Sequence, residues 1–190
     1  MNRRIAIRQL GFITAGVMLL PSCVKPARPV SIALKHLSIS GDQESMLAEI
    51  ADTIIPATDI PGAKQMNLQA FVLRMVDDCQ TPEAQKNFET GLASFEDEVK
   101  KKYSKSFEEC TPGERKSFLL EIDKLAKADR QGKKENPLTT FYSMTKRYTM
   151  KGFTNSEYVM TNIFAYNMLP GKFLGCVQIK DKNDVKTIMG

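Results

Sequence analysis

The sequence predicts an all-α fold, with a single helical domain of about five or six helices and a short irregular C-terminal tail. Apolar residues recur three or four positions apart through most of the chain, which is the spacing of amphipathic helices. Ser, Thr or Asn stands directly before most of these stretches, where a helix N-cap belongs. No stretch alternates apolar and polar residues for long enough to suggest a strand. The 190 residues are enough for one domain with a sizeable core.

An export signal is predicted over residues 1–22. Arg3 and Arg4 form an adjacent basic pair, and the uncharged run "GFITAGVMLLP" follows. That run is far shorter than the roughly 20 apolar residues a membrane-spanning helix needs. The arginine pair is typical of a twin-arginine signal, although Ala6 stands where a bulky apolar residue is usual. A general secretion signal is the alternative.

The signal ends in "LLPSC", which resembles a bacterial lipobox ending at Cys23. We therefore expect a periplasmic protein that is lipid-anchored to the cell envelope through Cys23. A simple cleaved signal or an uncleaved anchor is the alternative. Residues 23–39, which include two prolines, are predicted to be a tether. The helical domain then spans 40–190.

The first helix of the domain is predicted to start after Ser40, because Gln43 three residues later gives the pattern of a capping box. Apolar residues follow at helical spacing as far as Ile54. Pro56 should end the helix at or before Ile55, since the residue before proline avoids the helical conformation.

Three more helices are predicted with Asn67, Thr81 and Thr111 as caps. A proline follows each threonine at the first helical position, and Glu114 completes a capping box with Thr111. The apolar positions expected to face the core are Leu68, Phe71, Val72, Met75, Val76, Cys79, Phe88, Leu92, Phe95, Val99, Phe118, Leu119, Ile122 and Leu125.

A turn-rich linker over 131–137 should precede the last two helices. One spans roughly 138–150. The other is predicted to begin at Thr154, which would form a capping box with Glu157. A short extended tail is expected after Gly171.

The net charge gives no indication of nucleic-acid binding. The chain carries +5, but residues 1–22 hold three arginines and no acid. Without them, Lys and Arg fall from 27 to 24 against 22 acidic residues, a net charge of +2. The basic character therefore belongs largely to the signal.

The residue types of common catalytic and metal sites are sparse. The single histidine, His36, lies in the predicted tether, so histidine-based catalysis is hard to assemble. Asp77 and Asp78 are adjacent on a predicted helix and point in different directions, and they are best explained as surface acids or caps. We predict no catalytic, cofactor-binding or metal residues in this chain. With Cys23 assigned to lipid, three cysteines remain, and one disulfide with one free thiol is the simplest count.

Two stretches carry a family resemblance. "IADTIIPATDIPGA", leading into "FVLRMVDDC", and "TNSEY…YNMLPGKFLGC" near the end resemble the gluconate 2-dehydrogenase subunit 3 family. The resemblance runs from Leu47 to Cys176. It implies a non-catalytic small subunit of an exported dehydrogenase that oxidises a sugar or polyol. The implied partner is a large FAD-bearing subunit of the glucose-methanol-choline type, with a cytochrome c subunit as a further partner. In such complexes the small subunit commonly carries the signal that exports the folded partner.

The resemblance also implies site residues. The loop Ile55–Ala63 and the tail Leu169–Gly175 are expected to face the partner, because rigid loops lose less entropy on binding. The alternative is that both loops only close the helical core. A disulfide between Cys79 and Cys176 is implied by the family pattern, and three reduced cysteines are the alternative. The expected partner-facing residues are Ile55, Pro56, Asp59, Pro61, Gly62, Pro170, Gly171 and Phe173.

Two other functions stay open at this stage. One is an envelope lipoprotein without a dehydrogenase partner, acting as a binding or scaffold module. The other is a small independent enzyme that uses Asp52, Asp59 or Asp78.

Overall fold

The computed structural model describes residues 28–132, 136–164, 176 and 178, and in these residues every regular element is a helix. The all-α prediction is thereby confirmed. The elements are α2 (Gly41–Ile54), α3 (Leu68–Cys79), α4 (Pro82–Tyr103), the 3₁₀ turn η1 (Phe107–Glu109), α5 (Pro112–Gly132), α6 (Pro137–Thr154) and the π-helical turn η2 (Val159–Ile163). None of the helices among the described residues is long and apolar enough to span a bilayer.

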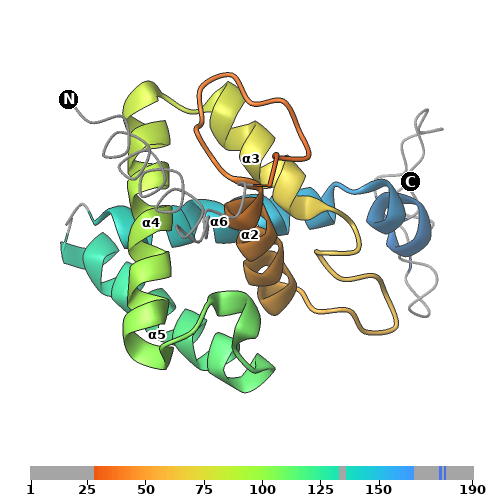
Figure 1. Cartoon of the computed structure of the whole chain (residues 1–190). Helices are drawn as coiled ribbons and strands as arrows, with labels where there is room; N and C mark the ends of the chain where they lie inside the picture. Colours follow the sequence, from red (N-terminus) through yellow and green to blue (C-terminus); the bar gives the residue numbers. More distant parts are fainter. Residues whose placement is uncertain (1–27, 133–135, 165–175, 177, 179–190) are drawn as a thin grey trace, which may run out of the picture.

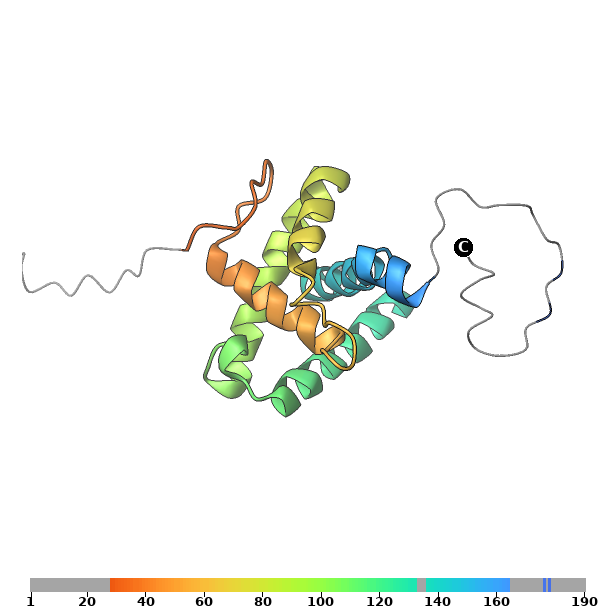
Figure 2. The ribbon, with the colours of Figure 1, turned by 90° about the vertical axis from the view of Figure 1, so that its right-hand side faces the viewer.

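Helix α6 lies at the centre of the domain, where it contacts α2, α3, α4 and α5 (Figures 1 and 2). The core around it is rich in phenylalanine. The ring of Phe95 on α4 lies 5.2 Å from Phe107, 5.2 Å from Phe118 and 5.6 Å from Phe141, measured between centroids. These edge-on contacts join α4, η1, α5 and α6 in one cluster. All four core positions predicted on α4 are buried: Phe88, Leu92, Phe95 and Val99.

The closest approach of α4 and α6 depends on Gly91. A Cβ atom at this position would lie 2.1 Å from the carbonyl oxygen of Pro137 and 2.5 Å from Cβ of Phe141. Real atoms do not come this close, so no larger residue fits without moving a helix.

Most predicted helix ends are confirmed. Ser40 and Gln43 form the expected capping box, and α2 ends at Ile54. The side chain of Thr81 accepts the amide of Ala84, 3.3 Å away. Thr111 and Glu114 exchange the reciprocal bonds of a capping box. Asn67 does precede α3, but it has a positive φ of 55° and its side chain makes no capping bond.

Three details of the predicted helices are wrong. Cys79, which was predicted to face the core, is exposed. Leu125 is 51% exposed and Ala126 is buried in its place, because the interhelical packing of α5 selects a slightly different face from the one the apolar pattern marks. Thr154 ends α6 instead of capping the next helix, since its hydroxyl donates to the Met150 carbonyl within α6. The backbone amide of Val159 donates a hydrogen bond to the hydroxyl oxygen of Ser156, 3.3 Å away.

The described part of the predicted tether packs on the domain. Leu37 and Ile39 are buried in the core. Carboxylates of the helices accept backbone amides of this segment: Glu44 from Ser31, and Asp77 from residues 35–37. Residues 28–39 therefore behave as a strap held on α2 and α3, and not as a free spacer. The sequence pattern missed this because the carboxylate partners lie 13 to 42 positions away.

Candidate partner interface

The loop between α2 and α3 is braced by its own backbone. The amide of Ala63 donates to the carbonyl of Ile55 at 2.9 Å, which closes the base of the loop. The amide of Leu68 then donates to the carbonyl of Ala63 at 3.0 Å, which leads directly into α3. Ile55 and Ala63 also pack in a small apolar cluster with Leu68 and the side chain of Phe153 from α6. The loop is thus anchored to the helices at both ends.

Gly62 is required by a close backbone approach inside this loop. A Cβ atom there would lie 2.5 Å from the amide nitrogen of Ala57 and 2.9 Å from the carbonyl carbon of Pro56. Both neighbours are backbone atoms, which cannot rotate away as a side chain can. Gly62 therefore lets the two sides of the loop touch, as the sequence predicted for a rigid loop.

An ion-pair network holds the loop to the helical body. Glu49 on α2 pairs with Lys64, just after the loop, and with Arg115 on α5. Burial of Glu49 raises its carboxyl pKa, but the hydrogen bond from Lys64 and the charge of Arg115 outweigh this, so the pKa is lowered overall. Glu49 is therefore ionised at neutral pH and links three parts of the fold.

The predicted interface residues of this loop divide into two groups. Pro56 and Asp59 are exposed on the loop, where they are available for contact. Ile55 and Pro61 are half-buried and Gly62 is buried, so these three shape the loop from within. The other predicted interface residues, Pro170, Gly171 and Phe173, lie outside the described residues, as do Arg3, Arg4 and Cys23.

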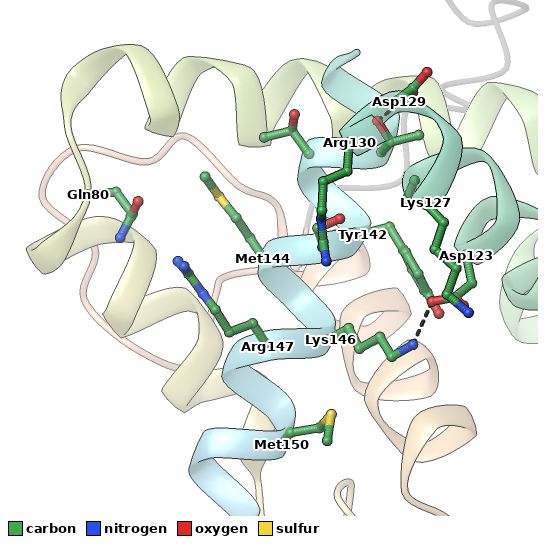
Figure 3. Close-up of a pocket in the computed structure, with 14 residues that line it drawn as sticks. Gln80, Asp123, Lys127, Asp129, Arg130, Tyr142, Met144, Lys146, Arg147 and Met150 are labelled. Atoms are coloured by element: carbon green, nitrogen blue, oxygen red, sulfur yellow. Dashed lines mark hydrogen bonds and ion pairs between the residues drawn. The ribbon is translucent and has the colours of Figure 1, made fainter. Parts of the chain in front are cut away.

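A groove between α5 and α6 is a second surface feature, which the sequence analysis did not identify. It has a volume of about 680 Å³, and its lining includes Gln80, directly after α3 (Figure 3). Its lining includes four basic residues, Lys127, Arg130, Lys146 and Arg147. Two acidic residues, Asp123 and Asp129, also line it, so the lining has a net charge of 4 − 2 = +2. The first and last of these four residues, Lys127 and Arg147, are 20 positions apart in the sequence. In the sequence, all four resemble ordinary charges on a helix surface.

The charges of the groove are unequally paired. Asp123 pairs with Lys127 at 2.8 Å and with Lys146 at 2.5 Å, and these contacts lower its pKa to about 2. Burial, followed by the nearby Asp123 charge, raises the pKa of the Tyr142 hydroxyl, which is therefore neutral at physiological pH. Within the described part of the chain, Arg130 and Arg147 make no ion pair.

The structure does not support the predicted disulfide. Cys79 and Cys176 are exposed free thiols, and Cys110 is a buried free thiol. The sulfur of Cys110 lies 3.4 Å from the carbonyl oxygen of Ser106, and burial raises its pKa.

The aspartates considered for an independent enzyme are distributed over different elements. Asp52 lies on α2, Asp59 lies in the loop and Asp78 lies in the last turn of α3, where it pairs with Lys35 at 3.1 Å. In the residues that the structure describes, no three His, Cys, Asp or Glu side chains gather as metal ligands would. Asp77, predicted to be a surface acid or a cap, is buried and caps the three amides of the strap.

Comparison with known proteins gives the family. The family model described as gluconate 2-dehydrogenase subunit 3 matches residues 41–171. Because this span covers most of the chain, the protein belongs to the gluconate 2-dehydrogenase subunit 3 family, as the sequence resemblance indicated. The family is named for one subunit of a dehydrogenase, which implies a complex of several subunits. No curated protein and no solved structure gives a significant match.

Proposed function

We propose that this protein is the accessory subunit of a periplasmic dehydrogenase complex and that it binds, and escorts during export, a large FAD-bearing subunit of the glucose-methanol-choline type. The family match over 41–171 carries this proposal. Oxidation of a sugar or polyol would take place at the partner's flavin. A cytochrome c subunit is a further proposed partner, which would accept the electrons.

The braced loop supports a role in binding. Pro56 and Asp59 are exposed on a loop that is tied down by backbone hydrogen bonds and by Glu49. A loop that is already ordered loses little conformational entropy when it is covered by a partner. We propose that the exposed residues of this loop contact the large subunit.

Export and anchoring are the second part of the proposal. Arg3 and Arg4 would direct export, and Cys23 would carry lipid. Docking of the strap begins by residue 28, where the carbonyl of Arg28 accepts the amide of Gly41 at 2.8 Å. Five residues span at most about 17 Å, so lipid on Cys23 would hold the domain close to the membrane surface. The strap would then connect the lipid anchor to the helical domain.

The first test is a pull-down of the tagged full-length protein from its native envelope. We expect a large subunit to co-elute, with flavin absorbance near about 450 nm. A colourless eluate that contains this chain alone would contradict the proposal and favour an envelope lipoprotein without such a partner.

Two variants test export and anchoring separately. Replacing both arginines with lysine, R3K together with R4K, should retain the large subunit in the cytoplasm if the folded partner is exported through the twin-arginine signal of this chain. C23A should move the protein from the membrane to the soluble periplasmic fraction. Unchanged fractionation of C23A would contradict lipid anchoring and leave partner binding intact.

A further inference from the structure

The α5–α6 groove combines unpaired cations with exposed apolar surface. Arg130 lies in the last turn of α5, and Arg147 lies on α6 (Figure 3). Met150, also on the lining, is 51% exposed. Exposed methionine adapts to irregular partner surfaces, and a guanidinium matches the geometry of a carboxylate.

The two arginines differ from the lysines beside them. Figure 3 shows Lys146 reaching Asp123, and Lys127 pairs with the same carboxylate at 2.8 Å. Arg147 stacks over the ring of Tyr148, with 4.7 Å from its guanidinium carbon to the ring centroid. It also donates one hydrogen bond, of 3.0 Å, to the Tyr148 hydroxyl. A guanidinium has five N–H donors, so most donors of Arg147 are left for another acceptor while the ring fixes its position.

The ends of this chain do not suit the groove. Residues 165–190 contain four lysines and two aspartates, a net charge of +2, and residues 1–27 contain four basic residues and no acid. Both have the same sign of charge as the groove lining. Charge complementarity therefore requires an acidic group from another molecule.

We infer that the α5–α6 groove binds an acidic segment of the large partner subunit, whose carboxylates pair with Arg130 and Arg147 while an apolar side chain contacts Met150. This inference rests on the proposed function. A protein segment fits better than a small anion, because the groove is partly open to solvent and would bury only part of a small ligand.

The test uses the full-length chain in its native envelope and compares two double variants. R130E with R147E reverses both groove charges. K116E with K124E is the matched control: it makes the same change in charge on exposed positions of α5 outside the groove. We expect recovery of the large subunit to fall about tenfold or more for the groove variant, and to stay within about twofold for the control. Recovery with the unaltered protein should also fall as salt is raised during washing.

Each outcome is decisive. If the unaltered protein retains the flavin subunit and the groove variant retains it equally well, the groove inference is wrong while the proposed function stands. If the unaltered protein retains no flavin subunit, both fail. Equal losses in the two variants would show a general charge effect and overturn the groove assignment. Micromolar binding of citrate, measured by calorimetry and abolished by R130E alone, would instead show a small-anion site.

Folding is checked independently. R130E is the second variant because the side chain of Arg130 is exposed and makes no hydrogen bond or ion pair with the described residues, so we expect the fold to be unchanged. The helical circular dichroism and melting temperature of R130E should match those of the unaltered protein. Reduced retention by this well-folded variant would support the inference, and full retention would contradict it.

Discussion

Asp77 on α3 is predicted to hold the N-terminal strap, and D77A is predicted to release it. The carboxylate accepts the backbone amides of Lys35, His36 and Leu37 at 2.8, 2.8 and 2.9 Å. Only the bond from Leu37 is fully buried, and leaving that donor unpaired costs about 1–3 kcal/mol. The other two donors are partly reached by water, and their bonds contribute about 0.5–1.5 kcal/mol each. The total is about 2–6 kcal/mol, with a midpoint of about 4 kcal/mol.

The assay is thermal unfolding together with hydrogen exchange of the three amides. For a chain of this size, about 4 kcal/mol corresponds to a melting temperature lower by about 8–16 °C. The amides of residues 35–37 should exchange much faster in D77A. The adjacent D78A is the control, because Asp78 pairs only with an exposed lysine, and its effect should stay below about 1 kcal/mol. Slow exchange of the three amides in D77A, or equal effects of the two variants, would refute the reasoning.

The same contact has a predicted pH dependence. Burial of Asp77 raises its pKa, but the three amide bonds outweigh burial, so its pKa in the folded protein is lowered. The unfolded value is about 3.9. A carboxyl group with a lowered pKa stabilises the folded state fully at pH values above its pKa in the unfolded chain. This stabilisation is lost as the pH falls through its pKa in the folded protein. The difference in melting temperature between D77A and the unaltered protein should therefore be constant near neutral pH and shrink below about pH 4.

Two further results are expected from other parts of the domain. G91A should destabilise by at least about 1–3 kcal/mol, because its Cβ would overlap the Pro137 carbonyl, whereas G113A on α5 meets no atom within 4 Å and should be neutral or slightly stabilising in urea unfolding. In native alkylation followed by mass spectrometry, exposed Cys79 should react quickly and buried Cys110 only after unfolding. A Cys79 that reacts only after reduction would show that it is in a disulfide.

Features set by residues near one another in the chain were predictable. The capping boxes at Ser40 and Thr111 depend on side chains three positions apart, and both formed. Pro56 ends α2 through a steric effect on its immediate neighbour. The apolar face of α4 that contains Phe95 is buried, as the helical spacing of its residues predicted. The family could be recognised for the same reason, since two short motifs at the ends of the domain carry it.

Features that depend on distant residues were not predictable. Asp77 and residues 35–37 are about 40 positions apart in the sequence. Neither stretch therefore reveals that the Asp77 carboxylate accepts the backbone amides of the strap. The groove cations come from two helices, and only their packing brings Arg130 and Arg147 to one surface.

Local sequence patterns were therefore enough to predict the helices, most of their caps and the family of this protein, because those depend on contacts within a few residues. The tertiary structure alone decided which acids are buried, that the strap packs on the domain and where the charged groove lies. These properties arise from packing between segments that are distant in the sequence, and no local sequence pattern encodes the relative positions of such segments.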